Sequence, residues 1–146
     1  MRISKRIEWC MGHRLANHQG GCRNLHGHQY ALEVVIEGEI NQEENSPSRG
    51  MVVDFGDVKE VLQKSVHDVC DHAFMIAETD SVMTDFFKQN PDLKHVSVPF
   101  DSTAENIAQW LFSNIKHELE KIKSVHLHSV QLWETSFNWA LVESDK

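Results

Sequence analysis

The chain has 146 residues, of which 40% are apolar and 25% charged, and its formal net charge is −8. This size and composition are typical of one globular domain, so we expect residues 1–146 to form a single domain. The negative charge argues against nucleic acid as a partner, and we expect no membrane association because no apolar run is long enough to cross a bilayer.

The cysteine content and the first residues both bear on the cellular compartment. The three cysteines, Cys10, Cys22 and Cys70, are odd in number and show no repeated spacing, which favours free thiols over a disulfide framework. The N-terminal segment has basic residues but lacks the apolar stretch of a secretion signal. We therefore expect a cytoplasmic protein with reduced thiols.

The first third of the chain reads as strands joined by loops. Residues 2–13 are predicted to form a strand, and residues 14–24, which include Asn17, Gly20 and Gly21, a loop. Apolar and polar side chains alternate over residues 26–36, which predicts a long, half-buried strand. Residues 41–50 are polar and contain Pro and Gly, so we expect a turn there, followed by a short strand over Met51–Phe55.

The remainder of the chain adds two long helices. Apolar residues at helical spacing predict one helix from about Val58 to Cys70, and the S-x-x-E sequence at Ser102–Glu105 predicts a capping box that opens the second. A short helix within 79–90 and strands at 95–99, 125–135 and 139–142 complete the pattern. This order predicts an α+β fold with the helices on one face of an antiparallel sheet.

Two histidines on the second strand suggest a metal site. His26 and His28 are two residues apart, so their side chains point to the same face of a strand and can chelate one ion. A catalytic zinc needs a third protein ligand, for which His13 is the nearest candidate and His18 a weaker one. The alternative is a pair of polar strand residues with no metal. The same spacing recurs at His126–His128, where we expect no metal.

The cysteines leave other interpretations open. A structural zinc site could use Cys10, His13 and Cys22, but Cys10 and His13 fall on opposite faces of a regular strand, so that site would need a bulge. Cys22 near a metal would have a lowered pKa and could act as a base or nucleophile, or it could be a fourth ligand. Cys70, near a helix end, is expected to be a packed thiol.

Two acidic positions, Asp71 and Glu134, are candidates for a function, and a third, Glu105, is not. Asp71 and His72 are either polar residues at a helix end or a proton-transfer pair in which the carboxylate orients the imidazole. Glu134 shares a strand face with apolar neighbours, and a buried carboxylate needs a partner, such as a planar ligand with two N–H donors. Glu105 is explained by the capping box.

Several blocks of the sequence, taken together, match one family. They are His13-Arg14-Leu15, Cys22-x-x-x-His26-Gly27-His28, GMVVDFGDVK at 50–59, Asp71-His72, STAEN at 102–106, and Trp133-Glu134-Thr135. On these blocks the chain resembles the 6-pyruvoyltetrahydropterin synthase / 6-carboxytetrahydropterin synthase family over nearly its full length.

The resemblance implies a fold, a cofactor and a set of site residues. It implies zinc bound by His13, His26 and His28, Cys22 as proton acceptor, Asp71 with His72 as proton relay, Glu134 gripping a pterin and joining the catalytic network, and Thr103 lining the pocket. It also implies the tunnelling fold, in which subunits pair their sheets into a barrel. Such proteins are commonly hexamers of two trimers, with active sites between subunits and the relay supplied by a neighbouring chain.

The position of the thiol narrows the implied reaction. A cysteine separated by three intervening residues from the HGH sequence, as in Cys22-x-x-x-His26, resembles the motif of the 6-carboxytetrahydropterin synthases of queuosine and deazapurine biosynthesis. The resemblance then implies a zinc-dependent lyase that converts 7,8-dihydroneopterin triphosphate and water to 6-carboxy-5,6,7,8-tetrahydropterin, acetaldehyde and triphosphate. The alternatives are the pyruvoyl-forming synthase, which eliminates triphosphate without cleaving the side chain, and a zinc or pterin-binding module without turnover.

Two further features concern the pocket. Arg14 and Arg23 are our candidates for contacts to the triphosphate. The chain has Trp9-Cys10-Met11-Gly12 where the family usually has Phe-x-Ala-Ala, so we expect a pocket of somewhat different shape.

Overall fold

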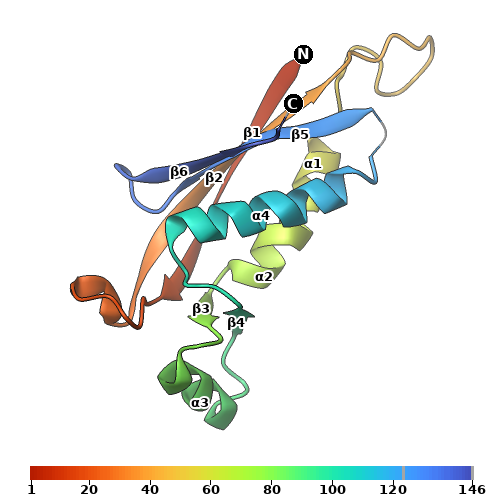
Figure 1. Cartoon of the computed structure of the whole chain (residues 1–146). Helices are drawn as coiled ribbons and strands as arrows, with labels where there is room; N and C mark the ends of the chain where they lie inside the picture. The colour runs from red at the N-terminus through yellow and green to blue at the C-terminus, as the bar shows by residue number, and fades with distance from the viewer. Residues whose placement is uncertain (123, 146) are drawn as a thin grey trace.

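The computed structural model describes residues 1–122 and 124–145, in which the helical segments at 55–70 and 104–119 cover one face of a six-stranded sheet (Figure 1). The strands are β1 (Arg2–His13), β2 (His26–Gly38), β3 (Ala73–Ala77), β4 (His95–Val98), β5 (Val125–Trp133) and β6 (Trp139–Glu143). The helices are η1 (Gly21–Arg23, 3-10), α1 (Phe55–Leu62), η2 (Gln63–His67, π), α2 (Asp68–Cys70), α3 (Ser81–Gln89) and α4 (Ala104–Leu119). The predicted α+β class is confirmed.

The sheet has the strand order β4-β3-β1-β2-β5-β6 and is mixed. The pairs β1–β2, β2–β5 and β5–β6 are antiparallel, as predicted, whereas β3 runs parallel to both β1 and β4. The prediction of a wholly antiparallel sheet is therefore wrong at this end. The reason for the β3–β4 pair is that α3 connects them, and a helical crossover returns the chain in its original direction.

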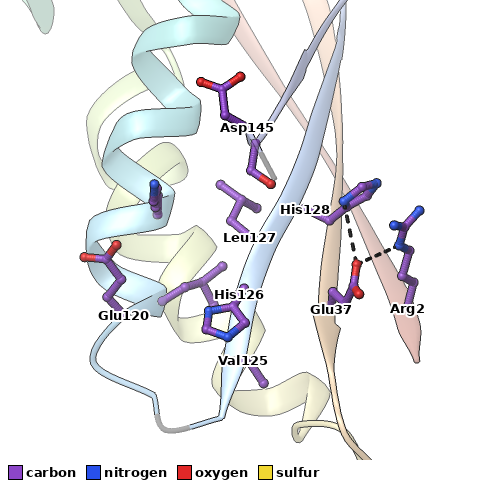
Figure 2. A pocket seen from close by; sticks show the side chains of 11 residues that line it. Arg2, Glu37, Glu120, Val125, His126, Leu127, His128 and Asp145 are labelled. Atoms are coloured by element: carbon purple, nitrogen blue, oxygen red, sulfur yellow. Dashed lines mark hydrogen bonds and ion pairs between the residues drawn. The ribbon is translucent and has the colours of Figure 1, made fainter.

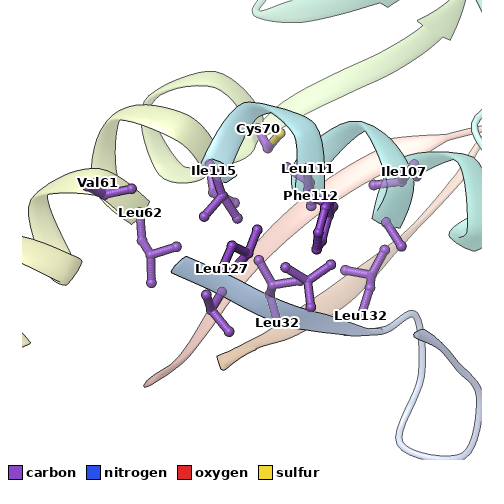
Figure 3. Packing of buried hydrophobic residues seen from close by; sticks show 14 of the residues in the cluster. Leu32, Val61, Leu62, Cys70, Ile107, Leu111, Phe112, Ile115, Leu127 and Leu132 are labelled. Atoms are coloured by element: carbon purple, nitrogen blue, oxygen red, sulfur yellow. The ribbon is translucent and has the colours of Figure 1, made fainter. Parts of the chain in front are cut away.

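The core lies between the sheet and α4. The predicted inner face of β2 is confirmed, because Tyr30, Leu32 and Val34 are all 0% exposed. A stripe on α4 that includes Ile107, Leu111 and Ile115 packs onto this face, together with residues of β5 and of α1 (Figure 3). Each buried leucine or isoleucine of this kind contributes about 1.5–3 kcal/mol relative to leaving the side chain in water.

The first long helix begins earlier than the sequence pattern indicated. Asp54 is the N-cap of α1, and its carboxylate accepts a hydrogen bond from the N–H of Gly56 at 2.7 Å. This cap places Phe55 in the helix, so the predicted short strand at Met51–Phe55 is wrong. The helical run then continues through η2 and α2 to Cys70, where its end was predicted.

The second long helix starts one residue later than the predicted capping box. Thr103 is the N-cap of α4, and its hydroxyl accepts a hydrogen bond from the N–H of Asn106 at 3.3 Å. Ser102 is fully buried and bonds elsewhere. Glu105 therefore lies in the first turn, where a carboxylate is favoured by the helix dipole, and does not close a box with Ser102.

The short strands β3 and β4 extend the sheet downward in Figure 1, where α3 packs on β3 through a separate apolar cluster of Ile76, Met83 and Phe87. The predicted short helix and the strand near His95 are both present. Within residues 1–122 and 124–145, every helix is too short or too polar to span a membrane.

Candidate metal centre

Three histidines meet on the helix-covered side of the sheet, where β1 ends and β2 begins. In the antiparallel register His13 lies opposite His26, and Met11 lies opposite His28. The possible ligand atoms of His13, His26 and His28 all lie within 4.8 Å of one another. The structure therefore brings the three predicted ligands together, which a chelate of one metal ion requires.

Backbone carbonyls orient two of these imidazoles. The Nδ1 of His13 lies 2.7 Å from the carbonyl oxygen of Ser102, and the Nδ1 of His26 lies 2.8 Å from that of Asn24. A carbonyl oxygen only accepts hydrogen bonds, so each Nδ1 carries the ring proton and donates it. The Nε2 atom of each neutral ring then has a free lone pair that can bind a metal. Such outer contacts fix the ring orientation of metal-binding histidines in general.

Burial favours the neutral form of two of the three imidazoles, those of His13 and His28. His13 is 1% exposed, and desolvation lowers its pKa to about 4 despite the hydrogen bond to Ser102. Desolvation also lowers the pKa of His28, although the carboxylate of Glu134 opposes the shift. A neutral imidazole is the form that binds a metal, so these two ligands need not lose a proton at neutral pH.

Glu134 follows the last residue of β5 and points at the histidines. Its Oε1 lies 3.4 Å from Nε2 of His13 and 3.5 Å from Nε2 of His28. The Nε2 of His13 is an acceptor when Nδ1 donates to Ser102, so two acceptors face each other here. A cation among these atoms would turn that repulsion into attraction, and the donor set fits a divalent metal.

A glycine lies between the two histidines of β2, and the space there is tight. A Cβ built on Gly27 would lie 2.9 Å from the carbonyl oxygen of Met11, closer than real Cβ contacts. Gly27 is paired with Gly12 of β1. Two facing residues without side chains let the strands carry the ligands on one face with nothing protruding from the other.

Cys22 lies in the exposed turn η1, between β1 and β2. Its carbonyl accepts a hydrogen bond from the N–H of Leu15 at 2.8 Å, which ties the thiol's turn to the chain just after His13. In the part of the chain that the structure describes, no cysteine joins the three-histidine group. The alternative site with Cys10, His13 and Cys22 is not assembled, and Cys10 projects on the other face of β1 from His13.

Asp71 and His72 form the pair that was predicted. The Nδ1 of His72 lies 3.0 Å from Oδ2 of Asp71, and both residues are tied to β1 through Cys10. The N–H of Cys10 donates to Asp71 Oδ1 at 3.2 Å, and the N–H of His72 donates to the Cys10 carbonyl at 2.8 Å. Although partial burial opposes it, the hydrogen bonds from Cys10 and His72 lower the pKa of Asp71.

The His72 side chain is 82% exposed and borders a shallow hollow with Cys10 and His28. Among the hydrogen bonds and ion pairs of residues 1–122 and 124–145, none joins His72 to Cys22 or to a histidine of the cluster. One chain therefore assembles the histidine cluster and the Asp71–His72 pair separately.

Arg14 is engaged in the protein interior. Its Nε and Nη2 donate to Oδ2 and Oδ1 of Asp80 at 2.6 and 2.7 Å, a bidentate pair in which the Asp80 side chain is 3% exposed. These hydrogen bonds raise the pKa of Arg14 and lower that of Asp80. The expectation that Arg14 contacts a triphosphate is therefore not supported, because its guanidinium fork is already occupied. Arg23 is exposed.

A hollow of about 590 Å³ lies between His28 of the cluster and the end of β5. His28, Gln29, Trp133, Glu134 and Thr135 are among the residues that line it. Thr103 is not among them.

Ser102 and Asp80 are two buried polar residues whose contacts to the end of β1 sequence reasoning did not predict. Ser102 belongs to the STAEN block at 102–106, which was the sequence signal that could have pointed to it. Asp80 lies 66 positions from its partner Arg14, and no motif pointed to their contact.

A second hollow lies at the opposite end of the sheet (Figure 2). It has a volume of about 530 Å³, and in it Glu37 lies 2.9 Å from Arg2 and 3.8 Å from His128. His126 and His128 do not form a metal group with other described residues. A register shift in the β2–β5 pairing leaves His128 unpaired, so the alternation that would align the two rings is broken.

Comparisons with known proteins agree with this geometry. The sequence model of the family "6-pyruvoyl tetrahydropterin synthase" matches residues 2–145. A protein of Haemophilus influenzae named 6-carboxy-5,6,7,8-tetrahydropterin synthase is 37% identical over 136 residues, which is 92% of each chain. A protein of the same name from Rickettsia bellii is 32% identical, covering 92% of this chain and 94% of the relative.

Solved structures share the fold. An uncharacterized protein from Wolinella succinogenes superposes with a TM-score of 0.82 at 24% identity, covering 99% of this chain and 98% of that one. The 6-pyruvoyl tetrahydropterin synthase of Caenorhabditis elegans superposes with a TM-score of 0.71, also at 24% identity, over 99% and 96% of the two chains.

Proposed function

The chain belongs to the 6-pyruvoyl tetrahydropterin synthase family, and from this premise we propose that it is a 6-carboxy-5,6,7,8-tetrahydropterin synthase. Its fold is the tunnelling fold of that family. The observation that carries the proposal is the three-histidine cluster, found in a chain whose relatives of that name match over 92% of its length. The proposed reaction converts 7,8-dihydroneopterin triphosphate and water to 6-carboxytetrahydropterin, acetaldehyde and triphosphate.

The proposed metal is zinc, held by Nε2 of His13 and His26 and by the imidazole of His28. Two observations support this choice. Three histidine nitrogens converge on one point, as in many catalytic zinc sites, and the hydrogen bonds from Nδ1 to the carbonyls of Ser102 and Asn24 leave the Nε2 atoms of His13 and His26 to bind the metal. Bound there, zinc would supply Lewis acidity to the hydroxyl groups of the substrate side chain.

The protein groups would bind the pterin and move protons. We assign Cys22 as the base that takes the proton from the substrate side chain, and Asp71 with His72 as the relay that carries protons to and from it. Glu134, beside the histidines and in the 590 Å³ hollow, would accept two N–H groups of the pterin edge. Thr103, the N-cap of α4, is assigned to the pocket wall on family resemblance alone.

A complete site would need more than one copy of the chain. The His72 side chain is 82% exposed and is bonded to none of the cluster histidines of its own chain, so it is available to a neighbouring subunit. The edge strand β6 exposes Trp139 (53%) and Leu141 (45%), and Phe137 precedes it at 90%. These features support a homo-oligomer, which we propose to be a hexamer in which sheets pair into a barrel.

The product would enter queuosine or another deazapurine pathway, and we propose a cytoplasmic location. The three free thiols support a reducing compartment.

Product analysis tests the proposal. The purified, zinc-loaded protein is incubated with 7,8-dihydroneopterin triphosphate, and the products are identified by mass spectrometry with a separate assay for acetaldehyde. We expect 6-carboxytetrahydropterin and acetaldehyde in equal amounts. A pyruvoyl product without acetaldehyde would identify the pyruvoyl-forming reaction, and binding of the pterin without turnover would identify a binding module.

A further inference from the structure

Three consecutive residues at the end of β1 connect to three different parts of the molecule. His13 reaches Ser102 through Nδ1, Arg14 reaches Asp80 through its guanidinium, and Leu15 reaches Cys22 through its N–H. Only Arg14 therefore lies between the proposed metal ligand His13 and Leu15, the residue whose N–H holds the turn that carries Cys22.

Arg14 is held from two sides. The guanidinium makes the bidentate pair with Asp80 at 2.6 and 2.7 Å, while the Arg14 carbonyl accepts a hydrogen bond from the Ser102 hydroxyl at 3.3 Å. The Arg14 side chain is 19% exposed, so the pair is largely shielded from water. A bidentate fork fixes direction as well as distance, which a single ion contact does not.

Asp80 is itself buried and held by hydrogen bonds. It is the N-cap of α3, its Oδ1 accepts from the N–H of Met83 at 3.3 Å, and its own N–H donates to the Ala77 carbonyl at 2.9 Å. The Asp80 carboxylate therefore links Arg14 to β3 and to the start of α3. Asp80 lines neither of the two hollows beside the histidine cluster.

We propose that Asp80 is a positioning residue which, by clamping Arg14, holds the Cys22 turn at its working place relative to the metal ligand His13. The mechanism is geometric: fixing residue 14 fixes the backbone direction of Leu15, and the Leu15 N–H fixes the Cys22 carbonyl at 2.8 Å. This inference rests on the proposed role of Cys22 as the base. The effect of such a clamp is on the alignment of reacting groups, not on metal binding.

The variants that test the clamp are Asp80→Asn and Arg14→Lys. Asparagine still caps α3 but cannot accept both guanidinium N–H groups. Lysine keeps the charge of Arg14 but offers one ammonium in place of a fork. The matched control is Asp85→Asn, which removes a carboxylate from the same helix at an exposed pair with Lys88.

Two readouts are used on the zinc-loaded protein. The first is the rate of Cys22 alkylation by iodoacetamide, followed peptide by peptide so that Cys10 and Cys70 are scored separately. The second is the pair of kinetic constants for dihydroneopterin triphosphate. We expect Arg14→Lys and Asp80→Asn to change the Cys22 alkylation rate at least about threefold and to lower kcat roughly 10- to 100-fold, with KM within about twofold. The control should match the wild type, and zinc content should be unchanged in all.

The outcomes separate the clamp from the proposed function. If Arg14→Lys matches the wild type in both readouts, the charge alone suffices and the clamp is refuted. A change of alkylation rate at Cys10 as large as that at Cys22 would also refute it, because the effect would then be general loosening. If Asp80→Asn does not fold, Arg14→Lys carries the test. A wild-type protein that does not turn over the triphosphate refutes the proposed function, and the alkylation result still decides the clamp's structural part.

Discussion

Replacing one histidine of each H-x-H pair should separate the metal site from its sequence look-alike. In His26→Ala one of three nitrogens within 4.8 Å is removed, whereas His126→Ala leaves all three in place. Both residues lie at the start of a strand and neither belongs to the buried core, so the two changes should disturb folding to a similar, small extent.

The size of the effect follows from binding linkage. Zinc at about 100 times its Kd stabilises the native state by about 2.7 kcal/mol, which at about 3 °C per kcal/mol for a chain of this size raises Tm by about 8 °C. Loss of a ligand should weaken binding at least about 100-fold, more than the loss of an outer contact costs. The same zinc then stabilises His26→Ala by only about 0.4 kcal/mol, or roughly 1 °C.

The assay is thermal unfolding of the metal-free proteins with and without added zinc, together with zinc titration by calorimetry. The expected shifts are about 8 °C for the wild type and for His126→Ala and about 1 °C for His26→Ala. A full zinc shift in His26→Ala would refute the assignment of the cluster. A lost shift in His126→Ala would show that the metal binds at the far end of the sheet.

Three further predictions concern the thiols and the core. Cys22→Ala should keep one zinc per chain and lower kcat at least about 100-fold, the usual effect of losing a general base; elemental analysis and product assays test this, and loss of zinc would make the thiol a ligand. Leu111→Ala should lower the free energy of unfolding by about 2–5 kcal/mol in urea titrations, because the side chain is 0% exposed, whereas Leu93→Ala, at a site 50% exposed, should lower it by less than about 1 kcal/mol. Burial raises the pKa of Cys70 from 9.0 to about 12, so its neutral form stabilises the native state fully below pH 9 and less as pH rises from 9 toward 12. Stability should therefore fall more steeply between pH 9 and 12 in the wild type than in Cys70→Ala, where buried Tyr30, whose pKa is also raised, still contributes a loss; equal slopes would contradict the prediction.

The parts of the fold that rest on periodic patterns were predictable. The alternation from His26 to Ile36 predicted both the strand and its buried face, and it placed His26 and His28 on one side. The stripe on α4 was predictable for the same reason. These patterns are local, since each is set by the repeat of one strand or one helix against the core.

Other features depend on contacts between distant positions. The Arg14–Asp80 pair joins residues 66 apart, so the sequence suggested a free cation where the structure has an occupied one. The helix starting at Phe55 was missed because Asp54 acts as its N-cap, and a carboxylate before an apolar run is also compatible with a turn after a strand. The parallel placement of β3 beside β1 follows from packing of the whole sheet, which no short stretch encodes.

The position of β1 in the sheet has a consequence for how the site opens. Its last three residues, Met11 to His13, pair with β2 on one side and with β3 on the other. His26, the first residue of β2, pairs with β1 and is preceded by the exposed turn η1. Amide hydrogens around His13 should therefore exchange with solvent only when the sheet itself opens, whereas those near His26 should exchange through local fraying. Metal exchange would then begin at His26, with His13 as the ligand that is released last.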